Sequence, residues 1–167
     1  MSRVVEKASL TTEPQPALTD LQCACATARQ VARVLTQLYD SRLRSSGVEA
    51  PQFALLMTLA QQGSCNQVDL GRRYALDKTT VSRNLKLLER NGWIESSIGA
   101  DRRERQFTLT PKGRKRIAQA KPAWKKAQNQ LQAGMTAAEW DAMFTTFRTV
   151  TRAAQTLQAQ NPRNPQK

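Results

Sequence analysis

The sequence predicts a mainly α-helical fold that contains one small β-hairpin. Apolar residues recur at spacings of three and four over most of the chain, which is the pattern of one buried helix face. The period changes over residues 93–98 and 105–109, where two short strand-like runs flank a charged turn. The predicted order is two helices, a helix-turn-helix, the hairpin and two further helices. This is the order of a winged helix-turn-helix with extra helices at both ends.

The first two helices are delimited by capping residues and glycines. Thr19 followed by Gln22 matches a capping box, and the helix that begins there is expected to extend to about Ser45. Pro51 suits the first turn of a second helix, which Gly63 is expected to end.

The next two helices are short and follow each other closely. Asn66 is a suitable N-cap for a third helix, and Asp69 would lie in its first turn beside the positive end of the helix dipole. Asp77 is a suitable N-cap for a fourth helix, Lys78–Arg90, and Asn91-Gly92 supplies its C-terminal stop. The pair predicts a helix-turn-helix.

Two helices are expected after the hairpin. Thr110 and Pro111 form the N-cap and first turn of a basic helix, which Pro122 is expected to kink. Thr136 and Glu139 form a capping box at the start of the last helix. A small winged domain cannot bury the apolar stripes of both terminal helices, which predicts a homodimer. The stripe of the last helix consists of Trp140, Met143, Phe144, Phe147, Val150, Ala154 and Leu157.

The charge balance indicates a polyanionic partner. The chain has 26 Lys and Arg against 13 acids, a net charge of +13, and an isoelectric point near 10.5. Residues 66–116 hold thirteen of the basic and six of the acidic residues, so about half of the net charge lies in less than a third of the chain. Such a concentrated field attracts nucleic acid.

Several function classes are excluded by what the sequence lacks. It has no histidine, no glycine-rich phosphate loop and no serine nucleophile motif, so we expect no enzyme and no cofactor. Its apolar runs are too short to span a bilayer and its N-terminus has no apolar signal core, which favours a cytoplasmic protein without membrane contact.

The fourth helix has two distinct faces. Val81, Leu85 and Leu88 recur at helical spacing and are expected to pack on the second and third helices. The other face carries hydroxyls and cations but no acid, which suits base edges and phosphates in a DNA groove. The candidate DNA-binding residues of this helix are Lys78, Thr79, Thr80, Ser82, Arg83 and Lys86.

The turn of the hairpin adds a second basic feature beside that helix. An arginine-rich loop in this position suits a minor groove. Either feature alone would also fit a solvated basic surface or a non-specific architectural nucleic-acid-binding protein, but the hydroxyls of the helix favour sequence-specific recognition. The candidate DNA-binding residues of the hairpin are Asp101, Arg102, Arg103 and Arg105.

Three segments together resemble the MarR family of bacterial transcriptional regulators. They are DKTTVSRNLKLLERNGWI at 77–94, DRR at 101–103 and LTPKG at 109–113, and the resemblance extends over about residues 20–158. It implies a triangular homodimer in which the first and last helices form the interface and the helix Lys78–Arg90 enters the major groove. It also implies that Asp101 and Arg103 steady the wing and contact DNA.

The resemblance sets the expected boundaries and activity. Such a dimer would bind a near-palindromic operator, most often as a repressor that an effector releases. The expected parts are a flexible tail (1–18), a MarR-type domain (19–158) and a second flexible tail (159–167). Within the domain, the winged helix-turn-helix covers about 50–113 and the dimerisation helices about 19–46 and 114–158.

Cysteines near the start of the first helix are candidate effector sites. Cys25 lies fourteen residues before Tyr39, a spacing similar to that of the reactive cysteine in the organic-hydroperoxide-sensing branch of the family. Arg29 and Ala50 stand where that branch has aromatic partners, although Arg29 could itself stabilise a thiolate.

Other interpretations of these residues stay open. Cys23 and Cys25 could be small buried apolar residues, or could join Cys65 or a second subunit in a disulfide or soft-metal switch. A small aromatic or anionic ligand meeting Arg29 and Arg33 is a further alternative.

Overall fold

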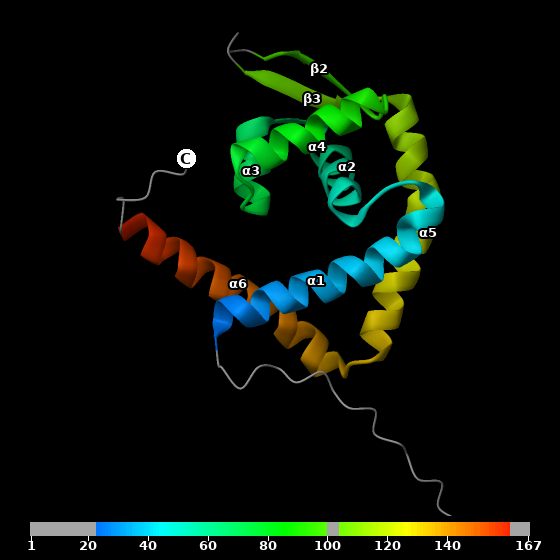
Figure 1. The fold of residues 1–167 in the computed structure, drawn as a ribbon. Helices are drawn as coiled ribbons and strands as arrows, with labels where there is room; N and C mark the ends of the chain where they lie inside the picture. Colours follow the sequence, from blue (N-terminus) through cyan, green and yellow to red (C-terminus); the bar gives the residue numbers. More distant parts are fainter. Residues whose placement is uncertain (1–22, 100–103, 161–167) are drawn as a thin grey trace, which may run out of the picture. The chain divides into compact units, whose positions relative to one another are not determined.

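The computed structural model describes residues 23–99 and 104–160 (Figure 1). The chain divides within its first helix, after Leu35, into two units, and the larger begins at Thr36. The expected mainly helical fold with a small antiparallel sheet is confirmed. The elements are α1 (Ala24–Leu43), a 3-10 turn η1 (Arg44–Ser46), α2 (Ala50–Gln62), β1 (Ser64–Asn66), α3 (Gln67–Tyr74), α4 (Lys78–Arg90), β2 (Ile94–Ile98), β3 (Arg105–Leu109), α5 (Pro111–Ala133) and α6 (Ala137–Gln160).

The sheet has three antiparallel strands in the order β1-β3-β2. The two strands of the expected hairpin, β2 and β3, pair from Ile94 opposite Leu109 to Ile98 opposite Arg105. The third strand, β1, was not predicted. It has only three residues and pairs with the other edge of β3, with Cys65 opposite Phe107.

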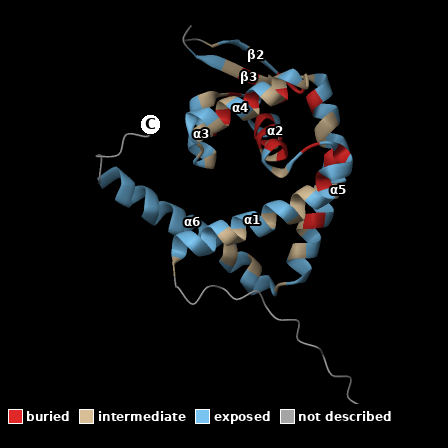
Figure 2. Ribbon diagram, in the orientation of Figure 1, coloured by how far each residue is buried: buried red, intermediate tan, exposed pale blue. Residues whose placement is uncertain are grey.

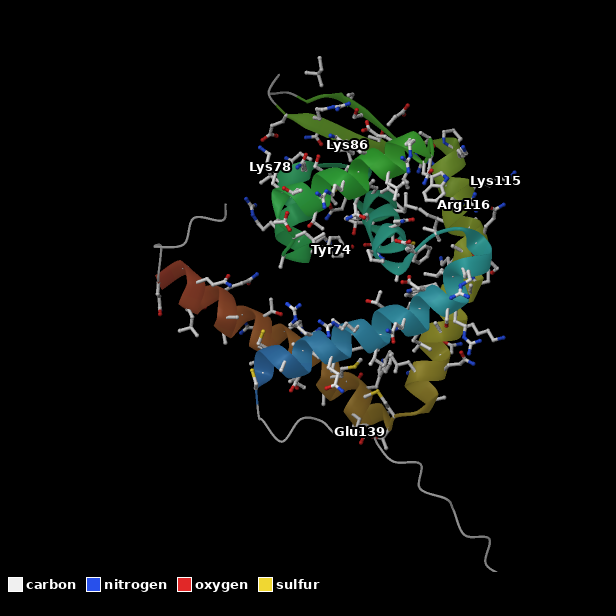
Figure 3. The ribbon with its side chains drawn as sticks, in the orientation of Figure 1. Tyr74, Lys78, Lys86, Lys115, Arg116 and Glu139 are labelled. Carbon is white, nitrogen blue, oxygen red and sulfur yellow. The ribbon has the colours of Figure 1, made fainter. Side chains whose placement is uncertain are left out.

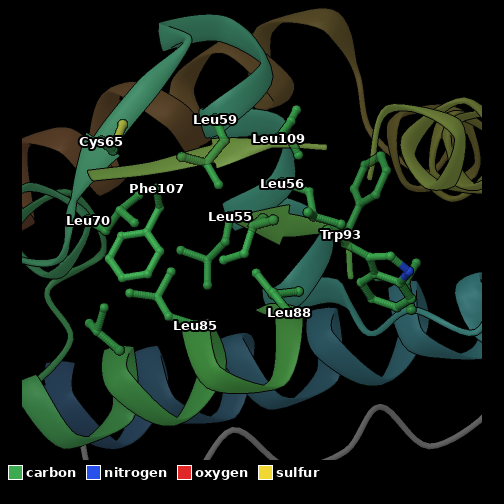
Figure 4. Packing of buried hydrophobic residues seen from close by; sticks show 14 of the residues in the cluster. Leu55, Leu56, Leu59, Cys65, Leu70, Leu85, Leu88, Trp93, Phe107 and Leu109 are labelled. Carbon is green, nitrogen blue, oxygen red and sulfur yellow. The ribbon is translucent and has the colours of Figure 1, made fainter. Parts of the chain in front are cut away.

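The core of the larger unit lies where α2, α3, α4 and the sheet meet (Figure 4). Leu55, Leu56 and Leu59 place three side chains of α2 at its centre, each exposed by 2% or less. Burial of each of these side chains stabilises this unit by about 1.5–3 kcal/mol. The cluster also includes Leu70, Val81, Leu85, Leu88, Trp93, Phe107 and Leu109.

The predicted N-caps begin their helices in the structure. The side chain of Asn66 accepts a hydrogen bond from the backbone N–H of Asp69 at 2.8 Å, and that of Thr110 accepts one from Gly113 at 3.0 Å. Thr136 and Glu139 exchange the reciprocal bonds of a capping box at the start of α6. The capping box expected at residues 19–22 lies outside the described residues.

The helix ends agree with the glycine signals. Gly63 and Gly92 have φ of 79° and 69°, a region that favours glycine, and they follow α2 and α4. Pro51 lies at the start of α2, where Glu49 and Gln52 form a capping box that the sequence reading missed. Helix α5 continues through Pro122 as one helix, so the proline does not divide it.

The end of α1 is attached to the core, whereas α6 is not covered by it. The carboxylate of Asp40 accepts from the backbone N–H of Ala50 at 2.6 Å, and Tyr39 donates its hydroxyl to Gln128 of α5. None of the 24 residues of α6 is buried (Figure 2). Among the described residues, no helix is long and apolar enough to cross a membrane.

Candidate nucleic-acid interface

Helix α4 presents one polar face because its apolar face is fixed in the core. Val81, Leu85 and Leu88 are exposed by 2% or less. The residues on the opposite side of α4 therefore point away from the core. Figure 3 shows Lys78 and Lys86 on this helix. Of the predicted face, Lys78, Thr79, Arg83 and Lys86 are exposed, whereas Thr80 and Ser82 are partly buried.

The start of α4 is stabilised by the side chain of Asp77. One carboxylate oxygen accepts from the backbone N–H of Thr80 at 2.9 Å, and the other accepts from the Thr80 hydroxyl at 2.7 Å. These hydrogen bonds from Thr80 lower the pKa of the Asp77 carboxyl. The Thr80 hydroxyl, predicted to face DNA, thus donates to a helix cap.

The turn between α3 and α4 is held by contacts that sequence reasoning missed. Gln67 donates from its side-chain amide to the backbone carbonyl of Lys78 at 3.1 Å, which links the first residue of each helix. Ala75 adopts a left-handed conformation with φ of 49° at the turn. No periodic pattern marks Gln67, and only its place directly after the predicted cap Asn66 could have drawn attention to it.

Tyr74 joins the end of α3 to α2. Its hydroxyl donates to the backbone carbonyl of Ala54 at 2.9 Å and lies 2.6 Å from the hydroxyl of Thr58, which is only 3% exposed. The helix-turn-helix is therefore attached to the core by polar as well as apolar contacts.

The hairpin lies beside α4 (Figure 1), and its strands end close together at the turn. The backbone N–H of Gly99 donates to the carbonyl of Glu104 at 2.8 Å. Three of the predicted wing residues, Asp101, Arg102 and Arg103, lie outside the described residues. The fourth, Arg105, is described at the start of β3.

Arg105 has partners within the protein. Its guanidinium lies 3.4 Å from the carboxylate of Glu89, donates to the Ser96 hydroxyl and lies 5.9 Å from the centre of the Phe107 ring. Its side chain is nonetheless 66% exposed.

The three cysteines occupy different environments. Cys25 is exposed, Cys23 is partly buried and Cys65 is buried. The Cys65 thiol donates to the side chain of Gln62 at 2.7 Å, and burial, aided by the charge of Asp69, raises its pKa. Within the single chain, the interpretation of Cys25 as a buried apolar residue does not hold.

The other candidate effector residues are placed as follows. Arg29 and Arg33 are exposed on α1, and Tyr39 is partly buried, which raises the pKa of its hydroxyl. No three His, Cys, Asp or Glu side chains among the described residues lie close enough together to hold a metal.

A helix-turn-helix followed by a hairpin, with a polar basic face on its second helix, defines the class of winged helix-turn-helix proteins. The MarR family model matches residues 48–104. The chain is 32% identical to the M. tuberculosis transcriptional regulator MosR, whose structure in complex with DNA matches 81% of this chain and 98% of that one with a TM-score of 0.75. The chain therefore belongs to the MarR family of transcriptional regulators.

Two further proteins are similar to this chain. A Bacillus subtilis protein named as an uncharacterized HTH-type transcriptional regulator, YwoH, is 27% identical over 71% of this chain and 87% of its own length. Bordetella bronchiseptica BpsR, whose DNA binding is described as regulated by 6-hydroxynicotinic acid, is 25% identical. Its structure covers 82% of this chain and 98% of its own, with a TM-score of 0.71.

Proposed function

We propose that this MarR-family protein is a regulator rather than an enzyme, and that it binds a specific duplex DNA sequence through α4. The observation that carries the proposal is the outer face of α4, on which Thr79, Arg83 and Lys86 are exposed with no acid among them. Long cations can reach phosphates and guanine edges, and a short hydroxyl can bond base edges. The likeness to MosR in complex with DNA supports this assignment.

Helix α4 is assigned to the major groove and the hairpin to the adjacent minor groove. The arrangement of the two elements supports this assignment, because the hairpin lies directly beside α4. The turn of the hairpin, 99–104, carries Asp101, Arg102 and Arg103. A helix fits the major groove, and arginine suits the narrower minor groove.

Binding to operator and to random duplex DNA tests the role of Arg83 in α4. Arg83→Ala is expected to weaken operator binding by about 1–3 kcal/mol and to relax sequence preference, if Arg83 contacts a base. Lys125→Ala, which removes an exposed cation from α5, is the matched control and should leave that preference unchanged. Equal losses on operator and random duplex for Arg83→Ala would contradict base recognition.

The operator itself can be located by footprinting the DNA that flanks the coding region of this protein. A protected, near-palindromic segment with half-sites about 34–36 Å apart is expected for a two-fold dimer. The alternative, a non-specific architectural protein, would protect no segment and show little preference among duplex sequences.

The second subunit is proposed to cover α6. The apolar side chains of α6 share one face, and Phe147 is 43% and Val150 51% exposed in the single chain. None of the elements from α2 to α5 forms an extended contact with α6. A long helix with an exposed apolar stripe needs a partner, and a second copy of this chain supplies the same stripe by symmetry.

The oligomeric state tests this proposal by light scattering after gel filtration. Phe147→Asp places a charge on the apolar face of α6 and is expected to shift the protein towards a monomer. Thr149→Asp makes the same change of charge on the opposite face and should leave the dimer intact. A monomeric wild type, or a Phe147→Asp variant that dimerises as well as the control, would refute the interface.

We propose repression that an effector relieves, a location in the cytoplasm, and the domain limits expected from the sequence, with the winged helix-turn-helix at about 50–113. A small aromatic acid is the effector class that the likeness to BpsR supports. Oxidation of Cys25, which is exposed, is the second candidate, with a cysteine of the second subunit or Cys65 as its partner.

Two measurements separate these effectors. If oxidation is the signal, peroxide should lower operator affinity in the wild type and not in Cys25→Ser. If an anionic ligand is the signal, 6-hydroxynicotinic acid or a similar acid should lower affinity, and Arg29→Ala should reduce that response. Unchanged affinity under both treatments would reject both candidates.

A further inference from the structure

The turn end of the hairpin, where Arg105 pairs with Ile98, is attached to the helix-turn-helix by two contacts. At residue 104, the carboxylate of Glu104 accepts from the side-chain amide of Asn66, the N-cap of α3, at 3.2 Å. At the next residue, the guanidinium of Arg105 pairs with Glu89 in the last turn of α4. The first contact joins the hairpin to the start of α3 and the second joins it to the end of α4, so both helices of the helix-turn-helix hold the hairpin near its turn.

The contacts of Arg105 connect three elements at one point. Its Nη2 atom pairs with Glu89 of α4 and donates to Ser96 of β2, while the guanidinium lies over Phe107 of its own strand. Phe107 is buried and pairs directly with Ser96, so the guanidinium rests on a fixed part of the sheet. An ion pair this exposed contributes little to overall stability, but it can select one orientation of the hairpin.

We propose that Arg105 and Glu89 form a brace that sets the angle between the hairpin and α4, and that Arg105 acts as a positioning residue and not as a phosphate contact. The inference rests on the proposed DNA-binding function. The groove contacts of α4 and of the hairpin turn must be made together, so their relative position determines how well both fit one duplex.

The brace predicts that one substitution changes the affinity for the operator in the direction opposite to the one expected from charge alone. Glu89→Gln removes a negative charge from the protein, and such a change ordinarily strengthens binding to DNA. If Glu89 positions the hairpin through Arg105, the substitution instead weakens operator binding. Glu95→Gln removes an equal charge on the face of β2 opposite to Ser96, and it serves as the matched control.

The experiment measures binding of the full-length protein to its footprinted operator and to a scrambled duplex of equal length, over a range of salt concentrations. Glu89→Gln and Arg105→Gln should each weaken operator binding at least about threefold, and the double variant should be no weaker than Arg105→Gln alone. Glu95→Gln should bind as well as the wild type or better. On scrambled duplex, Glu89→Gln should bind no more weakly than the wild type.

Three results would overturn the brace. The first is a Glu89→Gln variant that binds the operator as tightly as Glu95→Gln, and the second is a double variant in which the losses of Glu89→Gln and Arg105→Gln add. The third is an Arg105→Gln variant that lowers the salt slope by about one unit on both duplexes, because that change would mark a phosphate contact. A wild type without sequence preference would refute the proposed function itself, a distinguishable outcome. Circular dichroism checks that each variant is folded. If a variant is not folded, Ser96→Ala replaces it. This substitution removes one contact of the brace and should also weaken operator binding.

Discussion

Replacing Gly113 with alanine should destabilise the protein by separating α5 from the sheet. Gly113 lies in the first turn of α5, and a Cβ atom there would lie 1.9 Å from the carbonyl oxygen of Trp93 and 2.9 Å from its carbonyl carbon. Both are backbone atoms, and that oxygen accepts a hydrogen bond from the N–H of Thr110 at 3.1 Å. The start of α5 would have to move by about 1.5 Å to bring this Cβ atom to an ordinary contact distance.

The size of the effect follows from three terms. Overpacking of this kind costs about 1–3 kcal/mol, and loss of the bond between Thr110 and Trp93 costs about 1 kcal/mol more. Alanine recovers up to about 1 kcal/mol through its higher helix propensity. We therefore expect Gly113→Ala to lower the free energy of unfolding by about 1–4 kcal/mol, or the melting temperature by about 2–16 °C.

Urea denaturation at a fixed protein concentration measures this change, because the stability of a dimer depends on concentration. Gly134→Ala is the control, since its added Cβ atom would lie 3.5 Å from the nearest carbonyl oxygen, an ordinary contact. The control should change stability by no more than about 0.5 kcal/mol. A Gly113→Ala variant as stable as the control would show that α5 is free to shift and that the close approach carries no constraint.

Three further predictions concern single polar groups. Tyr74→Phe removes a hydroxyl that contacts Thr58, which is almost fully buried, and should cost about 1–3 kcal/mol in the same denaturation assay; no loss would mean that water replaces the hydroxyl. Asp77 has a lowered pKa in the folded state, so its contribution to the free energy of unfolding should be present above about pH 4 and be lost as the pH falls through the folded pKa. Asp77→Ala should lack this part of the acid sensitivity. Identical profiles of stability against pH for the variant and the wild type would contradict the assignment. Cys65 is buried with a raised pKa, so mass spectrometry should find it the slowest of the three cysteines to react with iodoacetamide until denaturant is added, and rapid labelling in the native protein would show that β1 opens easily.

Helix beginnings could be predicted from the sequence because they depend on a few neighbouring residues. Asn66, Asp77 and Thr110 each bond to a backbone N–H three residues further along the chain, so their signal is contained in a short segment. The buried face of α4 was likewise predicted, since its spacing alone determines which side chains share a side.

Strand β1 could not be predicted in the same way. Three residues are too few to show an alternating pattern, and the partner strand β3 lies about forty residues further along the chain. The capping box of Glu49 and Gln52 is a different case, since its spacing was visible but Pro51 alone was taken as the start signal.

The sequence predicted which side chains share the exposed face of α4, but it did not predict the contacts that these and neighbouring side chains make with one another. Periodicity identified the exposed cations Arg83 and Lys86 correctly as sharing the outer side of α4. It could not show that the hydroxyl of Thr80 bonds to a cap or that Arg105 pairs with Glu89, because these contacts depend on local rotamers and on the distance between separate elements.

The two roles of Asn66 restrict insertions and deletions in the short segment between α2 and α3. Asn66 is the last residue of β1, opposite Gln106, and also the residue that caps α3. Inserting or deleting one residue between Gly63 and Asn66 would turn the side chains of β1 to the other face of the sheet and would move the cap out of place at the same time. We therefore expect relatives that share this architecture to keep the length of this segment constant.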